Sequence, residues 1–168
     1  MLRRTYGWQL DRDPGTLWEG YGLGGRTDGF FGTYLTSMTH GHMAGAAAVL
    51  TNHVLGVAPA DFGFRAVDIV PRPGDVTWAQ GRVPTPHGAI DVGWRKDGDT
   101  FRMTVAVPKG TSARVGVPTS GAPVRITVDG ELAWDGAAGP GLHARAGGEH
   151  VYLDDLPPGD HEVLAVPR

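Results

Sequence analysis

A carboxylate set among aromatic residues is the first feature of this sequence that could do chemistry. Glu19 follows Trp18 directly and stands two residues before Tyr21, in a segment rich in glycine. Partial burial against aromatic rings raises the pKa of a carboxyl, and a raised pKa suits a general base. The same pattern also fits a loop carboxylate that accepts a backbone N–H. From local sequence alone we favour this second interpretation, because a single glutamate is a weak signal.

Two histidines, His40 and His42, come next, directly before a segment of helical period. Residues two apart do not share a face of a helix, so this pair lacks the i, i+4 spacing of a helical metal site. His53 and His87 could join them in space, but no spacing in the sequence requires it, and we predict no metal site. A histidine in this place would donate a hydrogen bond to a substrate hydroxyl, or equally to the loop beside it.

The elements that must position these side chains are helical. Residues 2–11 have apolar side chains at a spacing of four, which predicts the tail of a helix. Residues 16–36 interleave glycines with aromatic residues, a mixture typical of a loop packed over a cleft. Residues 41–56 predict a second helix, with Thr39 as its N-cap and Gly56 as its C-terminal stop.

After Pro59 the apolar residues change from a helical period to alternation, which predicts strands that bury one face. Asp-Gly pairs at residues 97–98 and 129–130 predict tight hairpins, because these residues tolerate positive φ. Residues 84–88, with two prolines, predict a stiff extended connection. The predicted strands cover residues 66–70, 76–83, 89–94, 100–107, 113–117, 124–128, 132–134, 150–153 and 161–166. We therefore expect an antiparallel β-sandwich that begins near Ala60.

Three tryptophans, Trp78, Trp94 and Trp134, fall within the predicted strands. Exposed on one face, they would stack on sugar rings and make the sandwich a carbohydrate-binding module. Pointing inward, they would fill the core or the contact with the helices. We favour the core, because large aromatic side chains in alternating strands are mostly buried.

The composition and net charge of the chain limit the classes of partner and chemistry that we expect. The 168 residues suffice for one domain, or for a domain and part of another. A net charge of −3 gives no reason to expect nucleic acid or a membrane as partner. The chain has no cysteine, which excludes disulfides and thiol chemistry. No apolar run reaches the ~18 residues that span a bilayer, and the first residues lack the apolar core of a secretory signal. We expect no cofactor, and the compartment stays open, with the cytoplasm as default.

Several stretches together resemble the C-terminal end of bacterial α-L-rhamnosidases. They are Glu19 within Thr-Leu-Trp-Glu, residues 37–41, residues 54–57, residues 70–81 and residues 83–88. These enzymes are glycoside hydrolases with a six-hairpin (α/α)₆ barrel and a C-terminal β-sandwich. The resemblance is close over about residues 1–120 and looser beyond them, and the stretch from residue 73 to residue 88 is its most specific part.

The resemblance implies a role for each candidate residue. Such enzymes are inverting: one carboxylic acid protonates the leaving oxygen, and a second carboxylate activates water on the opposite face of the sugar. Glu19 resembles that second carboxylate, the general base. His40 resembles a residue that contacts the sugar, and we expect Trp18 and His42 to contact substrate beside it. The family often has Trp where this chain has His42, which affects the rim of the pocket and the substrate preference.

The resemblance also implies an incomplete enzyme. Residues 1–60 would be the last helices of the barrel and residues 61–168 the sandwich, so the fold class is α+β overall. The general acid and the other pocket carboxylates would come from earlier barrel hairpins that no part of this chain matches. We therefore expect a C-terminal fragment, from a truncated reading frame or a split gene, that is inactive alone. Its partners would be a rhamnose-containing carbohydrate and the missing N-terminal barrel portion.

Two rival interpretations stay open. In the first, the chain is a stand-alone carbohydrate-binding or structural β-sandwich, with residues 1–60 as a helical cap. In the second, the chain is a subunit that completes a barrel supplied by a separate chain. On the fragment interpretation, by contrast, the N-terminal third would lack its barrel partners, expose an apolar patch and tend to self-associate. The apolar residues concerned are Trp8, Leu10, Phe30, Phe31 and Leu35.

Overall fold

The computed structural model describes residues 6, 7, 11 and 45–168, and the chain divides into two compact units, Met1–Val49 and Leu50–Arg168. In the first unit the described residues include one short helix, α2 (Gly45–Val49). The predicted loop over residues 16–36, and most of the predicted helix over residues 2–11, lie outside the described residues.

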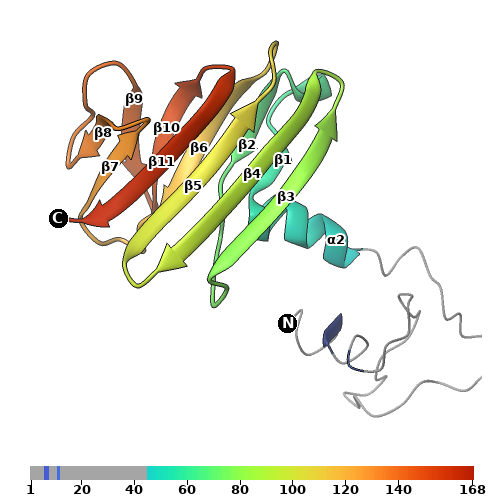
Figure 1. Ribbon diagram of the computed structural model, residues 1–168, viewed down its shortest axis with the longest axis horizontal. Helices are drawn as coiled ribbons and strands as arrows, with labels where there is room; N and C mark the ends of the chain where they lie inside the picture. The colour runs from blue at the N-terminus through green and yellow to red at the C-terminus, as the bar shows by residue number, and fades with distance from the viewer. Residues whose placement is uncertain (1–5, 8–10, 12–44) are drawn as a thin grey trace, which may run out of the picture. The chain divides into compact units, whose positions relative to one another are not determined.

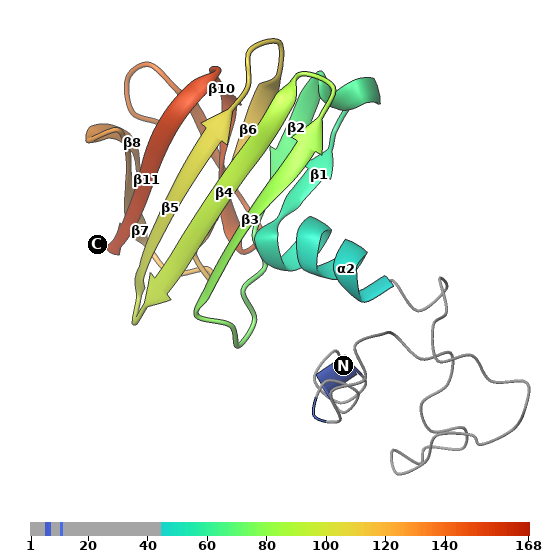
Figure 2. The same ribbon diagram turned by 45° about the vertical axis from the view of Figure 1, so that its right-hand side comes forward.

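The second unit is a two-layer β-sandwich (Figures 1 and 2). One sheet has five strands in the order β1-β2-β6-β10-β9, and the other has six in the order β3-β4-β5-β11-β7-β8. The strands are β1 (Val57–Pro59), β2 (Ala66–Ile69), β3 (Trp78–Thr85), β4 (Gly88–Asp97), β5 (Thr100–Val107), β6 (Ser112–Pro118), β7 (Val124–Val128), β8 (Glu131–Asp135), β9 (His143–Gly147), β10 (His150–Leu156) and β11 (Gly159–Pro167). A 3₁₀ turn, η5 (Phe62–Phe64), links β1 to β2.

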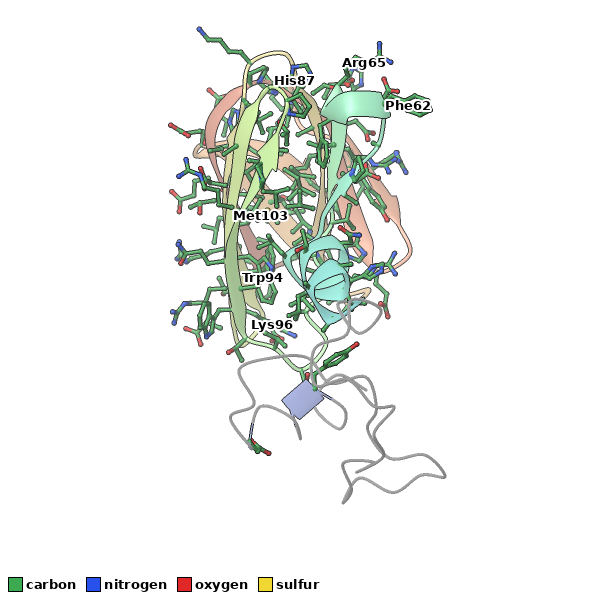
Figure 3. All side chains as sticks on the ribbon, turned by 90° about the vertical axis from the view of Figure 1, so that its right-hand side faces the viewer. Phe62, Arg65, His87, Trp94, Lys96 and Met103 are labelled. Carbon is green, nitrogen blue, oxygen red and sulfur yellow. The ribbon has the colours of Figure 1, made fainter. Side chains whose placement is uncertain are left out.

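The core lies between the two sheets, as the view along the layers shows (Figure 3). Strand β5 illustrates why these residues form strands: Phe101, Met103, Val105 and Val107 are buried, while the residues between them face outward. Alternation of this kind gives each strand one inner and one outer face. The largest fully buried side chains come from both sheets and include Ile69, Ile90, Met103, Ile126, Leu153 and Leu156.

The predicted antiparallel β-sandwich is confirmed in the main, and one strand pair departs from it. Strand β2 pairs with β6 in parallel, with Ala66 opposite Ser112 and Ile69 opposite Val115. Parallel neighbours need a long crossover, and here the chain forms β3, β4 and β5 of the other sheet between them. Alternation along a strand reports which face is buried but carries no information on the direction of its neighbour.

The two predicted Asp-Gly hairpins are confirmed. Asp129 and Gly130 both have positive φ, 52° and 86°, and join β7 to β8. Gly98, with φ of 57°, lies in the turn from β4 to β5. Twist-compatible two-residue turns require such backbone angles.

The connection predicted to be stiff and extended is instead a third tight hairpin. Thr85 pairs with Gly88, so Pro86 and His87 form a two-residue turn between β3 and β4. The Thr85 hydroxyl donates to the Gly88 carbonyl over 2.6 Å and accepts the His87 N–H over 3.2 Å. Proline pre-sets the φ of a turn as readily as that of an extended segment, and the threonine side chain here selects the turn.

The predicted helix over residues 41–56 is confirmed for its described part. Helix α2 continues directly into a π-helical turn, η4 (Leu50–Leu55), and ends at Gly56. Gly56 has a φ of 92°, and its N–H donates to the Thr51 carbonyl over 3.0 Å. Helix is therefore a small part of the described chain, and the described residues do not include a set of barrel helices. None of the helices described is long and apolar enough to cross a bilayer.

Candidate functional site

The four residues assigned to a sugar-cleaving site, Trp18, Glu19, His40 and His42, lie outside the described residues. Their assignment stays a prediction. His53 lies in η4 and His87 in the turn between β3 and β4, so they belong to different elements of the sandwich unit. Among the described residues there is no group of three or more histidines and carboxylates arranged to hold a metal ion.

The described part of the chain has a different candidate, a groove of about 950 Å³ on the outer face of the six-stranded sheet. Strands β3, β4, β5 and β11 lie side by side there (Figure 2). We call it the outer groove. Two cross-strand rows of residues line it. One row runs from Gln80 through Gly93 and Thr104 to Glu162, and the next runs from Arg82 through Asp91 and Ala106 to Asp160.

The floor of the outer groove is low because its central residues are small. Gly93, Thr104 and Ala106 occupy the two middle strands, β4 and β5. Alternation sends their neighbours Val92 and Val105 into the core, where they are almost fully buried. Longer side chains on β3 and β11 therefore form two walls above a flat floor.

Trp78 stands on the β3 wall and corrects the expectation that the strand tryptophans are buried. Its exposed fraction is 58%, whereas that of Trp94 is 3% and Trp134 is half-buried against the core. The alternation of side chains along β3 explains why Trp78 is exposed, because it places Trp78 on the same outer face as Gln80 and Arg82. The apolar–polar pattern of β3 could have given this answer from the sequence.

Ion pairs on the outer face are exposed and geometrically loose. Arg82 Nε lies 3.2 Å from Asp91 Oδ1, and Arg102 Nη1 lies 3.8 Å from Glu162 Oε1. Exposed pairs of this kind contribute at most about 1 kcal/mol to stability. Their side chains can therefore exchange these contacts for others at little cost.

One end of the outer groove is held by a more ordered cluster around Asp129. Its Oδ1 accepts the Glu162 N–H over 2.8 Å, and its Oδ2 lies 2.8 Å from His161 Nδ1. Two hydrogen bonds lower the pKa of the Asp129 carboxyl below its ordinary value. The bond from the Glu162 backbone has the larger effect, and the bond with His161 has the smaller one. The other ring nitrogen of His161 lies 2.9 Å from the Pro157 carbonyl. The cluster thus ties the β7–β8 turn to the start of β11.

Replacing Asp129 by asparagine is expected to change how stability depends on pH. Because the folded-state pKa is lowered, the charged carboxylate stabilises the fold above about pH 4, near the ordinary Asp value. That contribution is lost as the pH falls through the lower folded-state pKa. The difference in melting temperature between wild type and Asp129→Asn should therefore shrink as the pH falls from 6 to 2.5. A difference in melting temperature that stays constant across that range would contradict the lowered pKa of the Asp129 carboxyl.

A second hollow, of about 720 Å³, reaches one end of the sandwich and includes His150 and Tyr152 of β10. These side chains are already engaged in holding strands together. His150 Nε2 lies 3.0 Å from the Pro71 carbonyl, and the guanidinium of Arg145 lies 4.8 Å from the centre of the Tyr152 ring. Cation–π contacts of this kind stabilise the outer face of the five-stranded sheet.

Arg114 completes that arrangement from β6. Its Nη2 donates to Asp68 Oδ2 over 2.6 Å, and its guanidinium lies 5.6 Å from the Tyr152 ring. The hydrogen bond to Asp68 raises the pKa of Arg114 above its ordinary value. These contacts hold neighbouring strands together. They give no reason to assign a catalytic or binding role to the hollow beside Arg114, Arg145 and Tyr152.

The fold is that of a β-sandwich domain with a groove on the outer face of one sheet. Residues 56–131 match the family model described as the bacterial alpha-L-rhamnosidase C-terminal domain. The chain thus carries a C-terminal domain of the α-L-rhamnosidase family, and the resemblance drawn from the sequence is confirmed.

Relatives and solved structures agree with this assignment. The chain is 30% identical over 115 residues to an alpha-L-rhamnosidase of Streptomyces avermitilis, covering 68% of this chain and 11% of the relative. It is 30% identical over 117 residues to one of Alteromonas sp., covering 67% of this chain and 13% of the relative. The chain therefore spans only about an eighth of the length of the curated relatives that it matches.

Two solved structures share the fold. The structure of the alpha-L-rhamnosidase from Dictyoglumus thermophilum matches with a TM-score of 0.76 at 20% identity, over 95% of this chain and 17% of that one. The Streptomyces avermitilis enzyme, solved as a complex with L-rhamnose, matches with a TM-score of 0.72 at 25% identity, over 96% of this chain and 14% of that one.

Proposed function

We propose that this chain is the C-terminal part of an inverting α-L-rhamnosidase-type glycoside hydrolase that acts on α-L-rhamnosyl glycans or glycosides. The observation that carries the proposal is the match of residues 56–131 to the C-terminal domain of these enzymes. On this proposal, residues 1–60 contribute the last helices of the catalytic barrel, and residues 61–168 form the sandwich that follows it.

Glu19 would act as the general base of the reaction. Its carboxylate would take a proton from water as that water attacks the anomeric carbon. A second carboxyl, the general acid, would protonate the leaving oxygen from the opposite face, roughly 6.5–9.5 Å away. No residue of this chain is assigned to that acid. His40, Trp18 and His42 would contact the rhamnose ring and hold it between the two carboxyls.

The sandwich would fix the end of the helical segment that precedes it. The Trp94 indole N–H donates to the Val54 carbonyl over 3.0 Å, which ties η4 to the six-stranded sheet. Leu55 is buried beneath β3, and a Cβ on Gly81 would lie 2.8 Å from its Cδ2. The absence of a side chain at Gly81 thus lets the turn approach the strand closely. We propose that these contacts hold the last barrel helix in place.

The experiment has two arms, each measuring hydrolysis of p-nitrophenyl α-L-rhamnoside. In the first arm the purified chain is assayed alone, and we expect no turnover, because one carboxylate cannot serve as both acid and base. Turnover by the pure chain that Glu19→Gln abolishes would overturn the prediction of inactivity. The second arm supplies the rest of a barrel by placing this chain within a complete α-L-rhamnosidase.

A further inference from the structure

The location of the outer groove is not explained by the proposed role of the sandwich in holding the last helix. It lies on the face of the six-stranded sheet turned away from η4, since Leu55 contacts the inner side of β3 and Trp94 reaches Val54 from the inner side of β4. The groove consists only of residues between 78 and 162. The lining residues of the groove therefore do not include Glu19 or the other residues assigned to hydrolysis.

The shape and composition of the outer groove suit an extended ligand of mixed polarity. It crosses four strands, so its floor is about 14 Å wide at about 4.8 Å per strand spacing. One wall presents the exposed indole of Trp78, and the amide of Gln80 follows two residues later on the same face. An exposed tryptophan beside hydrogen-bonding side chains is characteristic of surfaces that bind a partner with both an apolar face and polar groups.

The charges around the groove select among such partners. Four carboxylates line it, and they belong to Asp91, Asp129, Asp160 and Glu162. Arg82 pairs with Asp91, and Arg102 beside the groove pairs loosely with Glu162, so the four carboxylates still outnumber these two cations. An acidic surface repels phosphates and uronates. Carboxylate oxygens accept hydrogen bonds well, so they favour a ligand rich in neutral hydroxyl donors.

We propose that the outer groove binds a neutral oligosaccharide, with one sugar ring stacked on Trp78 and hydroxyls donated to Asp160 and Glu162. The apolar face of a pyranose supplies the surface that an indole needs, and its hydroxyls supply the donors that the carboxylates need. Gly93 and Ala106 leave the space between these walls free for the ligand. The chain then has a glycan-binding surface distinct from the residues assigned to hydrolysis.

The test uses the full chain and titration calorimetry with a panel of neutral oligosaccharides, and polygalacturonate as the acidic comparison. We expect a neutral oligosaccharide to bind, and Trp78→Ala to weaken that binding at least tenfold. The matched control is Phe62→Ala, because Phe62 is a more exposed aromatic residue, at 88%, that projects from η5 outside the groove (Figure 3). This control should leave the affinity unchanged.

A second variant tests the groove without removing the aromatic ring. Gly93→Val fills the floor, and valine suits a strand position. The added Cβ would lie 3.2 Å from the Thr104 hydroxyl, whose hydrogen bond to the Gly93 carbonyl is long, at 3.4 Å, so a small shift relieves the contact. We expect this variant to keep its melting transition and to lose oligosaccharide binding.

Three outcomes would overturn the proposal. They are no binding of any neutral oligosaccharide at millimolar concentration, equal affinity in wild type and Trp78→Ala, and tighter binding of polygalacturonate than of neutral glycans. If Trp78→Ala instead converts a dimer to a monomer without affecting glycans, the face is an interface between two copies. A failed binding test leaves the hydrolysis proposal intact, because that proposal is judged by turnover and not by binding at this groove.

Discussion

Replacing Gly56 by alanine is expected to destabilise the sandwich by at least about 3 kcal/mol. Its φ of 92° costs an L-residue about 1–2 kcal/mol by itself. A Cβ at this position would also overlap the backbone of Pro71. The two segments cannot separate freely, because the Val70 N–H donates to the Gly56 carbonyl over 2.8 Å. Chemical denaturation followed by circular dichroism measures the effect.

Gly98→Ala is the matched control for this prediction. Gly98 also has a positive φ, 57°, but a Cβ there would meet no atom within 4 Å. Only backbone strain should appear, about 1 kcal/mol. Equal losses of stability in Gly56→Ala and Gly98→Ala would show that the close approach to Pro71 is not important.

Trp94→Ala is the second substitution expected to have a large effect, a loss of about 3–5 kcal/mol of unfolding free energy. The side chain is buried and stacks on Phe101, with ring centroids 5.9 Å apart at an angle of 27°. Its removal leaves a cavity beneath β4. It also leaves the Val54 carbonyl without the indole N–H that it accepts.

Two further variants separate the contributions of Trp94. Trp94→Phe keeps an aromatic ring against Phe101 but loses the hydrogen bond to Val54, so we expect a loss of about 1–3 kcal/mol. Trp78→Ala removes an exposed indole and should change stability by no more than about 0.5 kcal/mol. Trp94→Ala with the same stability as Trp78→Ala would contradict the packing described here.

The central strands of the sandwich follow directly from the sequence, whereas its two short edge strands do not. Strands β5 and β7 have the predicted bounds, because buried apolar residues alternate cleanly along them. Strands β1 and β9 were missed, and they form the two edges of the five-stranded sheet. Edge strands are often short and polar, a pattern that limits unwanted pairing. Strand β9, His-Ala-Arg-Ala-Gly, has little of the apolar signal on which the prediction depends.

The outer groove was harder to predict than the strands that form it. Trp78, Gln80 and Arg82 share one face of β3, and that much is evident from their spacing. The opposite wall comes from β11, which inserts between β5 and β7 in the sheet although it is the last strand in the chain. Alternation does not reveal strand order, so it could not predict that Glu162 lies in the row of Gln80 and Asp160 in the row of Arg82.

The predicted catalytic residues depend on family resemblance and not on local sequence pattern. Family resemblance assigns roles to Glu19 and His40, while local chemistry alone favoured an ordinary loop carboxylate. A role that depends on a partner carboxyl from elsewhere in a barrel cannot be derived from the spacing of residues within this chain. The roles of Glu19 and His40 therefore need a functional test.

The most direct test of the central proposal is to place this chain in the alpha-L-rhamnosidase of Streptomyces avermitilis, in exchange for the segment that matches it. We predict that the folded chimera hydrolyses p-nitrophenyl α-L-rhamnoside, and that Glu19→Gln lowers its kcat by about 10²–10⁴-fold. Glu131→Gln, at an exposed position of β8, should leave kcat unchanged. A folded chimera without activity, or one whose kcat is unaffected by Glu19→Gln, would contradict the proposal that this chain supplies the general base of a rhamnosidase.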